Sequence, residues 1–388
     1  MKVYIKWARN YEIDESLYQI IGGNFMNITV VGAGHGGTTI AADLKMKGHL
    51  VTLLKTSKGL HTEHFDHIAR NKGEITLLDH SVETAVHLDL VTTDVQLAIT
   101  NAEIIIIYVQ TNYHEDVIKR IIPFMNEDQI VLLEPGYLST AYFLKHEKEK
   151  SFTIVEAQSS PIDCRIVEPG KVKVLFKNVR NPVAIFTNRN EKVIQEKLNT
   201  LEYNFVYLNS IIEAALHNPN LIVHTIGGIM SIPRIEHTKG DYWMYKEVFT
   251  PHVWNIVNSL DDEKMNVLEA IGAERLPYVE ACRYRNSEDL TIDAKEAFLT
   301  YAKNSSPEGP FVADSRFITE DVPEGLVLLE SLGQMLGIKT PTCSSLIDIA
   351  SAALNVDFRK NARTVELLGK GNLEKIIGFT NHDFMIPA

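Results

Sequence analysis

The stretch MNITVVGAGHGGTTIAADLKMKGHLVTLLKTS, residues 26–57, decides the fold expected for this chain. Residues 27–31 form a short β-branched run that suits a buried parallel strand. A Gly-x-Gly-x-x-Gly pattern follows at once, and then come an apolar helical segment and a second apolar run. Glycines between a strand and a helix are typical of dinucleotide-binding domains, whereas the same pattern without this context would be weak.

Each glycine of the turn can serve a different physical purpose. Gly32 can take the tight turn, Gly34 lets a pyrophosphate approach the backbone, and Gly37 lets the helix pack close to the strand. The helix N-terminus offers N–H groups and a positive dipole end to phosphates. We predict a bound dinucleotide contacted by these glycines together with His35 and Gly36, with a purely structural turn as the alternative.

The end of the second apolar run bears on the choice of cofactor. NAD-preferring sites usually place Asp or Glu here for the ribose 2′-hydroxyl. This chain has Lys55, Ser57 and Lys58 instead. Because ammonium and hydroxyl groups suit a 2′-phosphate, we predict NADP(H) in preference to NAD(H). The alternative is that both lysines are solvated loop charges.

Apolar runs and helical segments alternate until about residue 207, and helical periodicity then takes over. We expect an α/β protein: a Rossmann-type doubly wound parallel sheet over 26–207, which includes EITLLD at 74–79, followed by an all-helical domain over 208–388. Residues 1–25 are interpreted as an extension upstream of a natural start at Met26, with an appended helix as the alternative.

Composition excludes several function classes. A net charge of −12 argues against a nucleic-acid or anionic membrane partner. The three cysteines form no close pair, so disulfides and a zinc cluster are not expected, and a reducing cytoplasm fits. No apolar run is long enough to span a bilayer.

The stretch HNPNLIVHT, residues 217–225, places polar groups inside an apolar helical run. Pro219 fits the first turn of a helix and Asn218 its cap. Asn220 and His224 are four residues apart and therefore share one helix face. A lone histidine of this kind can also be a satisfied core residue.

The stretch DSRFITEDVPEGL, residues 314–326, supplies possible charged partners for His224. Taken alone, it is a charged surface loop that leads into a helix. A carboxylate such as Asp321 beside an imidazole would raise its proton affinity and fix its tautomer. Arg316 can bind a substrate carboxylate with two parallel hydrogen bonds.

With these motifs the chain resembles the octopine/nopaline (opine) dehydrogenase family from Met26 to near residue 370. The resemblance also rests on the segments LLEPG and EAQSSPIDCR. Its most specific motifs are GDYWMYKEVFTPHV, RFITEDVPEGLVLLESLGQMLGIKTP and LIDIASAALNVDFRKNARTVELLG. The family joins a dinucleotide domain to a helical domain, with the active site between them.

The resemblance implies that an amino acid condenses with a 2-oxo acid, often pyruvate, and that NAD(P)H reduces the imine. By motif, His224 matches the catalytic histidine and Asn220 the asparagine one turn before it. Asp321 matches the acid partner of the histidine, and Arg316 matches the arginine that holds a substrate carboxylate. Because Lys55 occupies the 2′ position, a family-wide cofactor cannot be assumed, and NAD(H) stays an alternative to NADP(H).

Other interpretations stay open at this point. One rival is an NAD(P)-dependent reductase of 2-oxo or 2-hydroxy acids. Another is a non-catalytic NADP-binding regulator, but such a protein would not need the set of polar residues Asn220, His224, Arg316 and Asp321. The final helices can pack within the domain or form a homodimer. Four aromatic residues either line the amino-acid pocket or pack in the core: Tyr242, Trp243, Tyr245 and Phe249.

Overall fold

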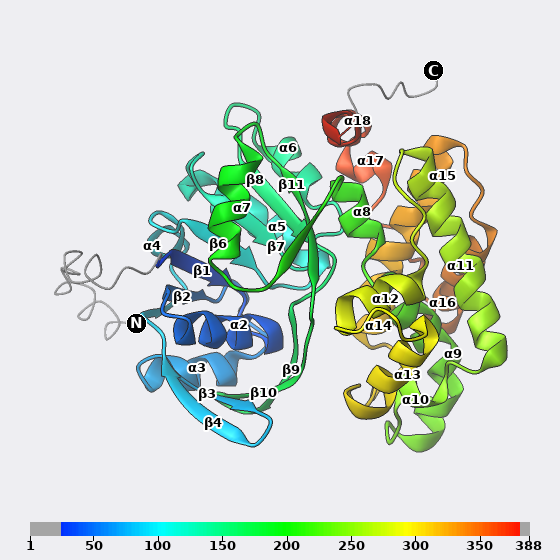
Figure 1. Ribbon diagram of the computed structural model, residues 1–388, viewed down its shortest axis with the longest axis horizontal. Coiled ribbons are helices and arrows are strands. Elements are labelled where there is room, and N and C mark those ends of the chain that lie inside the picture. The colour runs from blue at the N-terminus through cyan, green and yellow to red at the C-terminus, as the bar shows by residue number, and fades with distance from the viewer. Residues whose placement is uncertain (1–24, 381–388) are drawn as a thin grey trace.

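The computed structural model describes residues 25–380. The predicted extension at 1–25 therefore lies outside the described residues, apart from Phe25. A sheet with its helices forms one half of the molecule, and a group of helices forms the other (Figure 1). No helix in the described part of the chain is long and apolar enough to cross a membrane.

The main sheet has eight strands in the order β12-β11-β8-β7-β6-β1-β2-β5. Strand β1 is central and pairs in parallel with β2 and β6. The predicted parallel arrangement holds from β8 to β5, but β11 pairs antiparallel with β8. The strands are β1 (Asn27–Val31), β2 (Leu50–Leu54), β5 (Leu90–Thr92), β6 (Ile104–Ile107), β7 (Ile130–Leu133), β8 (Thr153–Ala157), β11 (Asn181–Phe186) and β12 (Phe205–Leu208).

The assignment of residues 74–79 to this sheet was wrong. They form β3 of a second sheet, ordered β4-β3-β10-β9. A two-residue turn with His80 at φ 53° leads from β3 directly into the antiparallel β4, whereas a parallel neighbour needs a long crossover. The strands of this sheet are β3 (Glu74–Asp79), β4 (Val82–His87), β9 (Ile162–Glu168) and β10 (Lys171–Lys177).

Helix α2 lies between the two sheets, because it contacts β1 and β2 as well as β3, β4, β9 and β10. Its buried positions are mostly small or apolar, which allows this close packing. The helices of the sheet-bearing half are α2 (His35–Met46), α3 (Thr62–Arg70), α4 (Val95–Ile99), α5 (His114–Ile121), α6 (Thr140–His146) and α7 (Glu191–Asn199), with 3₁₀ turns at Thr111–Tyr113 and Ile122–Phe124.

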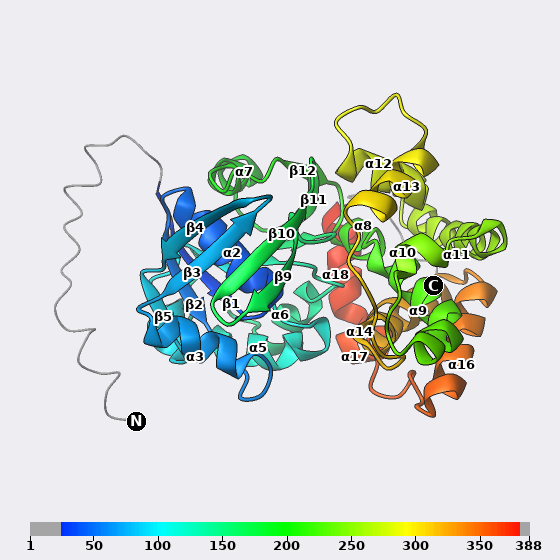
Figure 2. The same cartoon turned by 90° about the horizontal axis from the view of Figure 1, so that it is seen from below.

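Up to residue 380, where the described part of the chain ends, all elements after β12 (which ends at Leu208) are helices, although the boundary near residue 207 stays a prediction. Helix α18 returns to contact α6 and α8, and Figure 2 shows it between the sheet and the other helices. The helices are α8 (Ile211–Leu216), α9 (Asn220–Thr238), α10 (Met244–Glu247), α11 (Pro251–Ala270), α12 (Tyr278–Asn286), α13 (Ala294–Asn304), α14 (Arg316–Thr319), the π-helical Val322–Leu326, α15 (Val327–Leu336), α16 (Pro341–Leu354), α17 (Val365–Leu368) and α18 (Lys370–Thr380).

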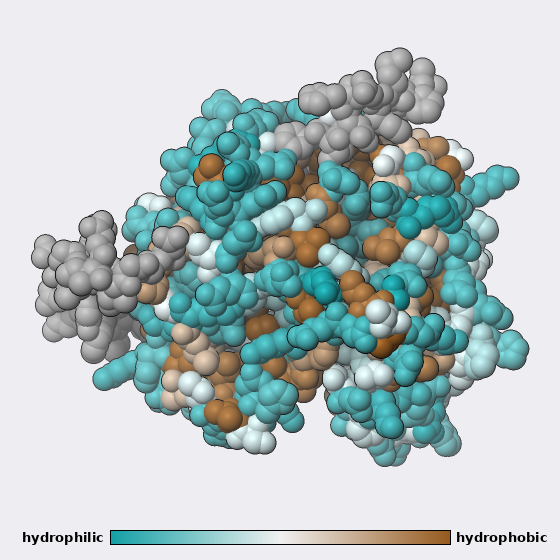
Figure 3. All heavy atoms as spheres, viewed as in Figure 1, coloured by the Kyte–Doolittle hydropathy of each residue, from teal (hydrophilic) through white to brown (hydrophobic). Residues whose placement is uncertain are grey.

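The face in Figure 3 is mostly hydrophilic, with apolar side chains near its middle.

Candidate active site

The glycine turn between β1 and α2 has the geometry that a pyrophosphate needs. Gly32 has φ +119°, and a Cβ atom there would lie 2.2 Å from the Tyr108 carbonyl oxygen. A Cβ atom on Gly37 would lie 1.9 Å from the Gly32 carbonyl oxygen, so only glycine permits this approach of helix to strand. Gly34 precedes α2 without a side-chain cap and leaves the first turn open for an anion. The turn therefore fits a dinucleotide.

Gly36 and His35, two other predicted cofactor residues, also make contacts within the protein. A Cβ atom on Gly36 would lie 2.8 Å from the ring of Tyr108, so the glycine lets that ring pack beneath the turn. The Nδ1 atom of His35 accepts a hydrogen bond from the Ile166 N–H at 2.9 Å. Burial is the main reason why the pKa of His35 is lowered to about 4, and the ring is therefore neutral near pH 7.

His61 is a residue at this turn that the sequence analysis missed. Its ring lies 5.0 Å from that of His35, centroid to centroid, and one of its carbon atoms faces Gly34. His61 precedes α3 with φ 55°, an unusual backbone conformation that no pattern in the sequence indicated. The His61 ring therefore lies beside Gly34, the residue that precedes the first turn of α2.

Lys55, at the end of β2, is 6% exposed, which disagrees with the alternative that it is a solvated loop charge. Its Nζ atom donates to the Ser57 hydroxyl at 2.9 Å and to the Leu60 carbonyl oxygen. Burial lowers the pKa of Lys55. The structure thus brings Lys55 and Ser57 together, while Lys58 is exposed in the loop. These groups suit a 2′-phosphate, since an ammonium and a hydroxyl can both donate to it.

His224 and Asp321 lie in contact. The Nδ1 atom of His224 is 2.8 Å from Oδ2 of Asp321, and the Asp321 side chain is 1% exposed. The other carboxylate oxygen accepts a hydrogen bond of 3.1 Å from the Tyr137 hydroxyl. The ring of His224 stacks on Phe317 at 3.6 Å. These contacts fix the imidazole with Nδ1 toward the carboxylate and leave Nε2 for proton transfer, without a hydrogen bond to any described residue.

The helix that carries His224 begins one residue later than predicted, because α9 starts at Asn220 and Pro219 takes the cap position. The Asn218 side chain accepts a hydrogen bond from the Asn220 N–H at 3.0 Å. Asn220 is half-buried one turn before His224, and its side chain makes no hydrogen bond within the described part of the chain. The amide is therefore available to a ligand on the same helix face.

Arg316 is held next to this pair, but its partner is another acid. Its Nε atom lies 3.0 Å from a carboxylate oxygen of Glu320, and its side chain is 47% exposed. The other Glu320 oxygen accepts hydrogen bonds from the Thr111 N–H at 2.9 Å and from its hydroxyl at 3.0 Å. The terminal nitrogens of Arg316 make no hydrogen bond to a described residue, so they can receive a carboxylate. The charge of Arg316 also contributes to lowering the pKa of His35, which places the arginine near the glycine turn.

A buried arginine that the sequence analysis missed ties the two halves together. Arg363 is 1% exposed and donates to the carbonyl oxygens of Gly136, at 2.9 Å, and Thr111, at 2.7 Å. Its Nε atom lies 2.7 Å from a Glu324 oxygen. Because Gly136 and Thr111 follow β7 and β6, these bonds join the carboxyl ends of the sheet to the segment that carries Asp321. A single arginine late in the chain gives no local signal of this role.

The carboxyl end of β7 also carries a buried acid. Glu134 is 3% exposed and accepts a hydrogen bond from the Tyr108 hydroxyl. Burial raises the pKa of Glu134 to about 8, so its carboxyl group is largely protonated near pH 7. Because the Tyr108 ring packs against Gly36, this acid lies beneath the glycine turn.

The aromatic cluster of residues 242–249 is mostly core. Tyr242, Tyr245 and Phe249 are at most 9% exposed, in agreement with the core-packing alternative. Trp243 is half-buried, with the Lys246 ammonium 4.9 Å from its ring centroid.

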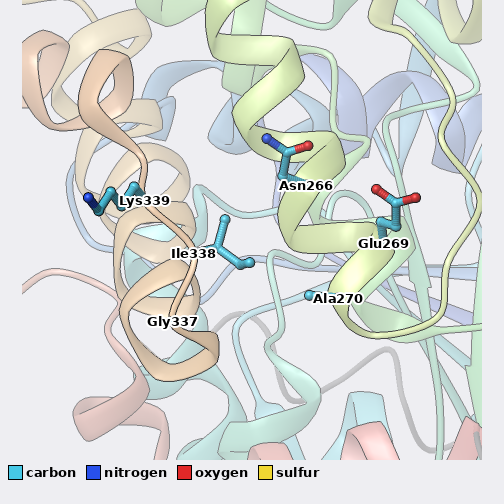
Figure 4. A pocket seen from close by; sticks show the side chains of 6 residues that line it. All are labelled: Asn266, Glu269, Ala270, Gly337, Ile338 and Lys339. Carbon is cyan, nitrogen blue, oxygen red and sulfur yellow. The ribbon is translucent and has the colours of Figure 1, made fainter.

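Two surface pockets lie away from all these residues. One has a volume of about 490 Å³ between α11 and the end of α15 (Figure 4). The other, of about 300 Å³, lies beside β12 and the start of α8. Neither pocket is lined by a predicted site residue, so neither is part of the candidate active site.

Comparisons with known proteins agree with this two-part organisation. Residues 207–354 match the family model of the NAD/NADP octopine/nopaline dehydrogenase α-helical domain. Residues 27–137 match that of the NAD-dependent glycerol-3-phosphate dehydrogenase N-terminus. The chain is 26% identical over 350 residues to an opine dehydrogenase of Arthrobacter sp. (strain 1C), covering 89% of this chain and 95% of the relative.

Solved structures share the fold. An octopine dehydrogenase with NADH and L-arginine superimposes with a TM-score of 0.72 at 17% identity, covering 93% of this chain and all of that one. A yersinopine dehydrogenase with bound NADP⁺ gives a TM-score of 0.65 at 15% identity, covering 92% of this chain and 98% of that one. The same architecture therefore accommodates either dinucleotide.

Proposed function

Because this chain belongs to the octopine/nopaline (opine) dehydrogenase family of NAD(P)-dependent oxidoreductases that act on CH–NH groups, we propose that it condenses an amino acid with a 2-oxo acid such as pyruvate and reduces the resulting imine. The observation that carries this proposal is the 2.8 Å contact between His224 and Asp321. Relatives named opine dehydrogenase support the reaction class.

In this proposal His224 moves the protons of imine formation. The amine nitrogen attacks the carbonyl carbon to give a carbinolamine, which must lose a proton from nitrogen and gain one on oxygen before water leaves. The Nε2 atom of His224 can give and take these protons, because Asp321 holds the proton on Nδ1. Asn220, on the same helix face, would hydrogen-bond the reacting group.

Arg316 would bind the carboxylate of the 2-oxo acid. Glu320 holds its Nε atom, and the two terminal nitrogens are left for a carboxylate in bidentate geometry. This contact would fix the orientation of the carbonyl carbon toward the cofactor. When bound, the reduced dinucleotide supplies the hydride.

NADP(H) is the proposed cofactor, and NAD(H) the alternative. The ammonium group of Lys55 and the hydroxyl of Ser57 lie 2.9 Å apart at the end of β2, where the ribose 2′ position is read. Lys58 would contribute charge from solvent. The site is expected to work in the cytoplasm with small-molecule substrates, either as a monomer or as a homodimer.

The test is oxidation of NADPH, with NADH in parallel, by pyruvate alone and by pyruvate with single amino acids. Oxidation that requires an amino acid supports the proposal and identifies the amine. The same rate without any amine would assign the protein to the 2-oxo acid reductases. Tight NADPH binding without turnover on any pair would favour a regulator.

A further inference from the structure

A second cluster of polar side chains lies where the two halves of the molecule meet, and it has no role in the mechanism above. It consists of Asp163 on β9, Arg285 on α12 and Tyr301 on α13. We propose that this cluster binds the amino-acid substrate as a zwitterion, with Arg285 holding its carboxylate and Asp163 its amino group. The inference rests on the proposed function and names the part of the chain that selects the amine.

Arg285 is the strongest indication of a ligand. Its residue is only 7% exposed, and its Nε atom donates to the Asn286 side chain at 3.1 Å. Neither terminal nitrogen makes a hydrogen bond or an ion pair with a described residue. The two terminal nitrogens are not sealed from solvent, so a ligand can reach them. A carboxylate would satisfy both nitrogens with two parallel hydrogen bonds.

The backbone around Arg285 is fixed by the sheet-bearing half of the molecule. Its carbonyl oxygen accepts hydrogen bonds from the Val179 N–H at 2.8 Å and from the Arg180 N–H at 3.2 Å. Arg180 in turn donates to the Tyr284 carbonyl oxygen at 2.9 Å. The arginine is therefore held in place before any substrate arrives, which lowers the entropy lost on binding.

Asp163 offers the opposite charge in the same place. One oxygen accepts a hydrogen bond of 2.9 Å from the Tyr301 hydroxyl, and the other makes none within the described part of the chain. Arg285 is among the charges that act on Asp163, yet the two side chains do not form an ion pair. An anion site and a cation site that are close but not joined match the two charges of an amino acid.

An electrostatic interaction with His224 links this cluster to the reaction. The charge of His224 also acts on Asp163, and burial raises the pKa of the Asp163 carboxyl. Because the zwitterion carries an ammonium group, its nitrogen must release a proton before it can attack the 2-oxo acid, and the Asp163 carboxylate that holds it would accept that proton. Tyr301 packs edge-to-face on Phe176 at 5.4 Å and on Tyr245 at 5.6 Å, so the walls of the site come from both halves of the molecule.

The experiment combines removal of the charge from the enzyme with removal of the carboxylate from the substrate. The apparent KM of the best L-amino acid and that of its decarboxylated amine are measured for the wild-type protein and for Arg285→Met, with saturating NADPH and pyruvate. We expect the wild-type protein to bind the amino acid about 100-fold better than the amine, and Arg285→Met to lose that difference. The KM of pyruvate should stay unchanged.

Arg283→Met is the matched control. Arg283 lies on the same helix, but it pairs with Glu280 at 2.5 Å and donates to the Ile292 carbonyl oxygen at 2.9 Å. Its removal should leave the preference for the carboxylate intact. If Arg285→Met does not fold, Arg285→Lys and Asp163→Asn replace it, and both should raise the KM of the amino acid but not that of pyruvate.

The outcomes separate this inference from the proposed function. No amine-dependent turnover by the wild-type protein would refute the proposed function itself. Turnover with an unchanged preference for the carboxylate in the Arg285 variants would refute only the role of Arg285. A rise in the KM of pyruvate instead would assign Arg285 to the 2-oxo acid and overturn the inference.

Discussion

Tyr137 and His224 bind opposite oxygens of the same carboxylate, that of Asp321, at 3.1 and 2.8 Å. Tyr137 follows β7 of the sheet, whereas His224 and Asp321 belong to the helical half. The orientation of the imidazole therefore depends on contact between the two halves of the molecule. This dependence is a reason why a cofactor domain and a helical domain work as one enzyme.

Replacement of Asp321 by Asn should remove the acceptor that holds the proton on Nδ1 of His224. We expect kcat/KM for imine reduction to fall by about 100-fold or more, since positioned acid–base groups contribute about 10²–10⁴-fold. Steady-state kinetics measure this, with NADPH binding by fluorescence as the control. Near wild-type turnover in a normally folded Asp321→Asn protein would exclude the proposed acid–base pair.

Replacement of Tyr137 by Phe should have a smaller effect. It removes one hydrogen bond to Asp321 and keeps the ring, so we expect kcat to fall about 5- to 10-fold, in line with roughly 1–1.5 kcal/mol for one bond. The pH profile of kcat should shift, because the unbound oxygen makes the carboxylate more basic. An unchanged profile would indicate that the hydroxyl does not tune the pair.

Replacement of Arg363 by Met should destabilise the fold. It leaves Glu324 buried without its cation and removes the hydrogen bonds to the carbonyl oxygens of Gly136, Tyr137 and Thr111. Breaking such a buried pair costs about 3–5 kcal/mol. Arg275→Met is the comparison, because Arg275 is partly exposed beside the exposed acids Asp262 and Glu269 and should cost about 1 kcal/mol or less. Urea unfolding distinguishes the two. An equal decrease in the free energy of unfolding in both variants would contradict the interdomain role of Arg363.

The buried Glu134 should make the stability of the protein depend on pH. Its pKa is raised from an ordinary value of 4.5 to about 8, so the folded chain retains a proton that the unfolded chain loses between these values. The free energy of unfolding should therefore decrease as pH rises through this window and level off above about 8.

Glu134→Gln isolates this contribution. Urea unfolding at about pH 5 and about pH 8 should show that the variant loses less stability than the wild-type protein over this window. The glutamine carbonyl can still accept the Tyr108 hydrogen bond, so the fold is retained. The same pH dependence in both proteins would show that Glu134 titrates normally.

Replacement of Lys55 by Met tests the cofactor. Loss of a charged hydrogen-bond donor should raise the Kd of NADPH about 10- to 100-fold and leave that of NADH nearly unchanged. The exposed Lys58→Met should have a smaller effect, because solvent screens its charge. Fluorescence titration of both dinucleotides gives these values. Equal weakening of NADPH and NADH by Lys55→Met would favour a structural role for the lysine.

Local sequence was sufficient to predict the glycine turn and, to within one residue, the start of α9. Both depend on residues within a few positions of one another: a strand, glycines and a helix in one case, and Asn218 with Pro219 in the other. The assignment of residues 74–79 failed because an apolar strand pattern does not specify its partner. The short turn at His80, which sends the chain into a hairpin, determined which sheet the strand joins.

The sequence by itself determined which chemical groups are available: the cofactor turn, His224 with Asn220 on one helix face, and the acids and arginines further along. Only the tertiary structure decided which of them meet. Asp321 reaches His224 across 97 residues. Arg316 binds Glu320, Arg363 joins the two halves, and the terminal nitrogens of Arg285 are left without a partner among the described residues. These outcomes depend on how helices and strands pack over long sequence separations, because burial and charge pairing are properties of the folded interior and not of any local pattern.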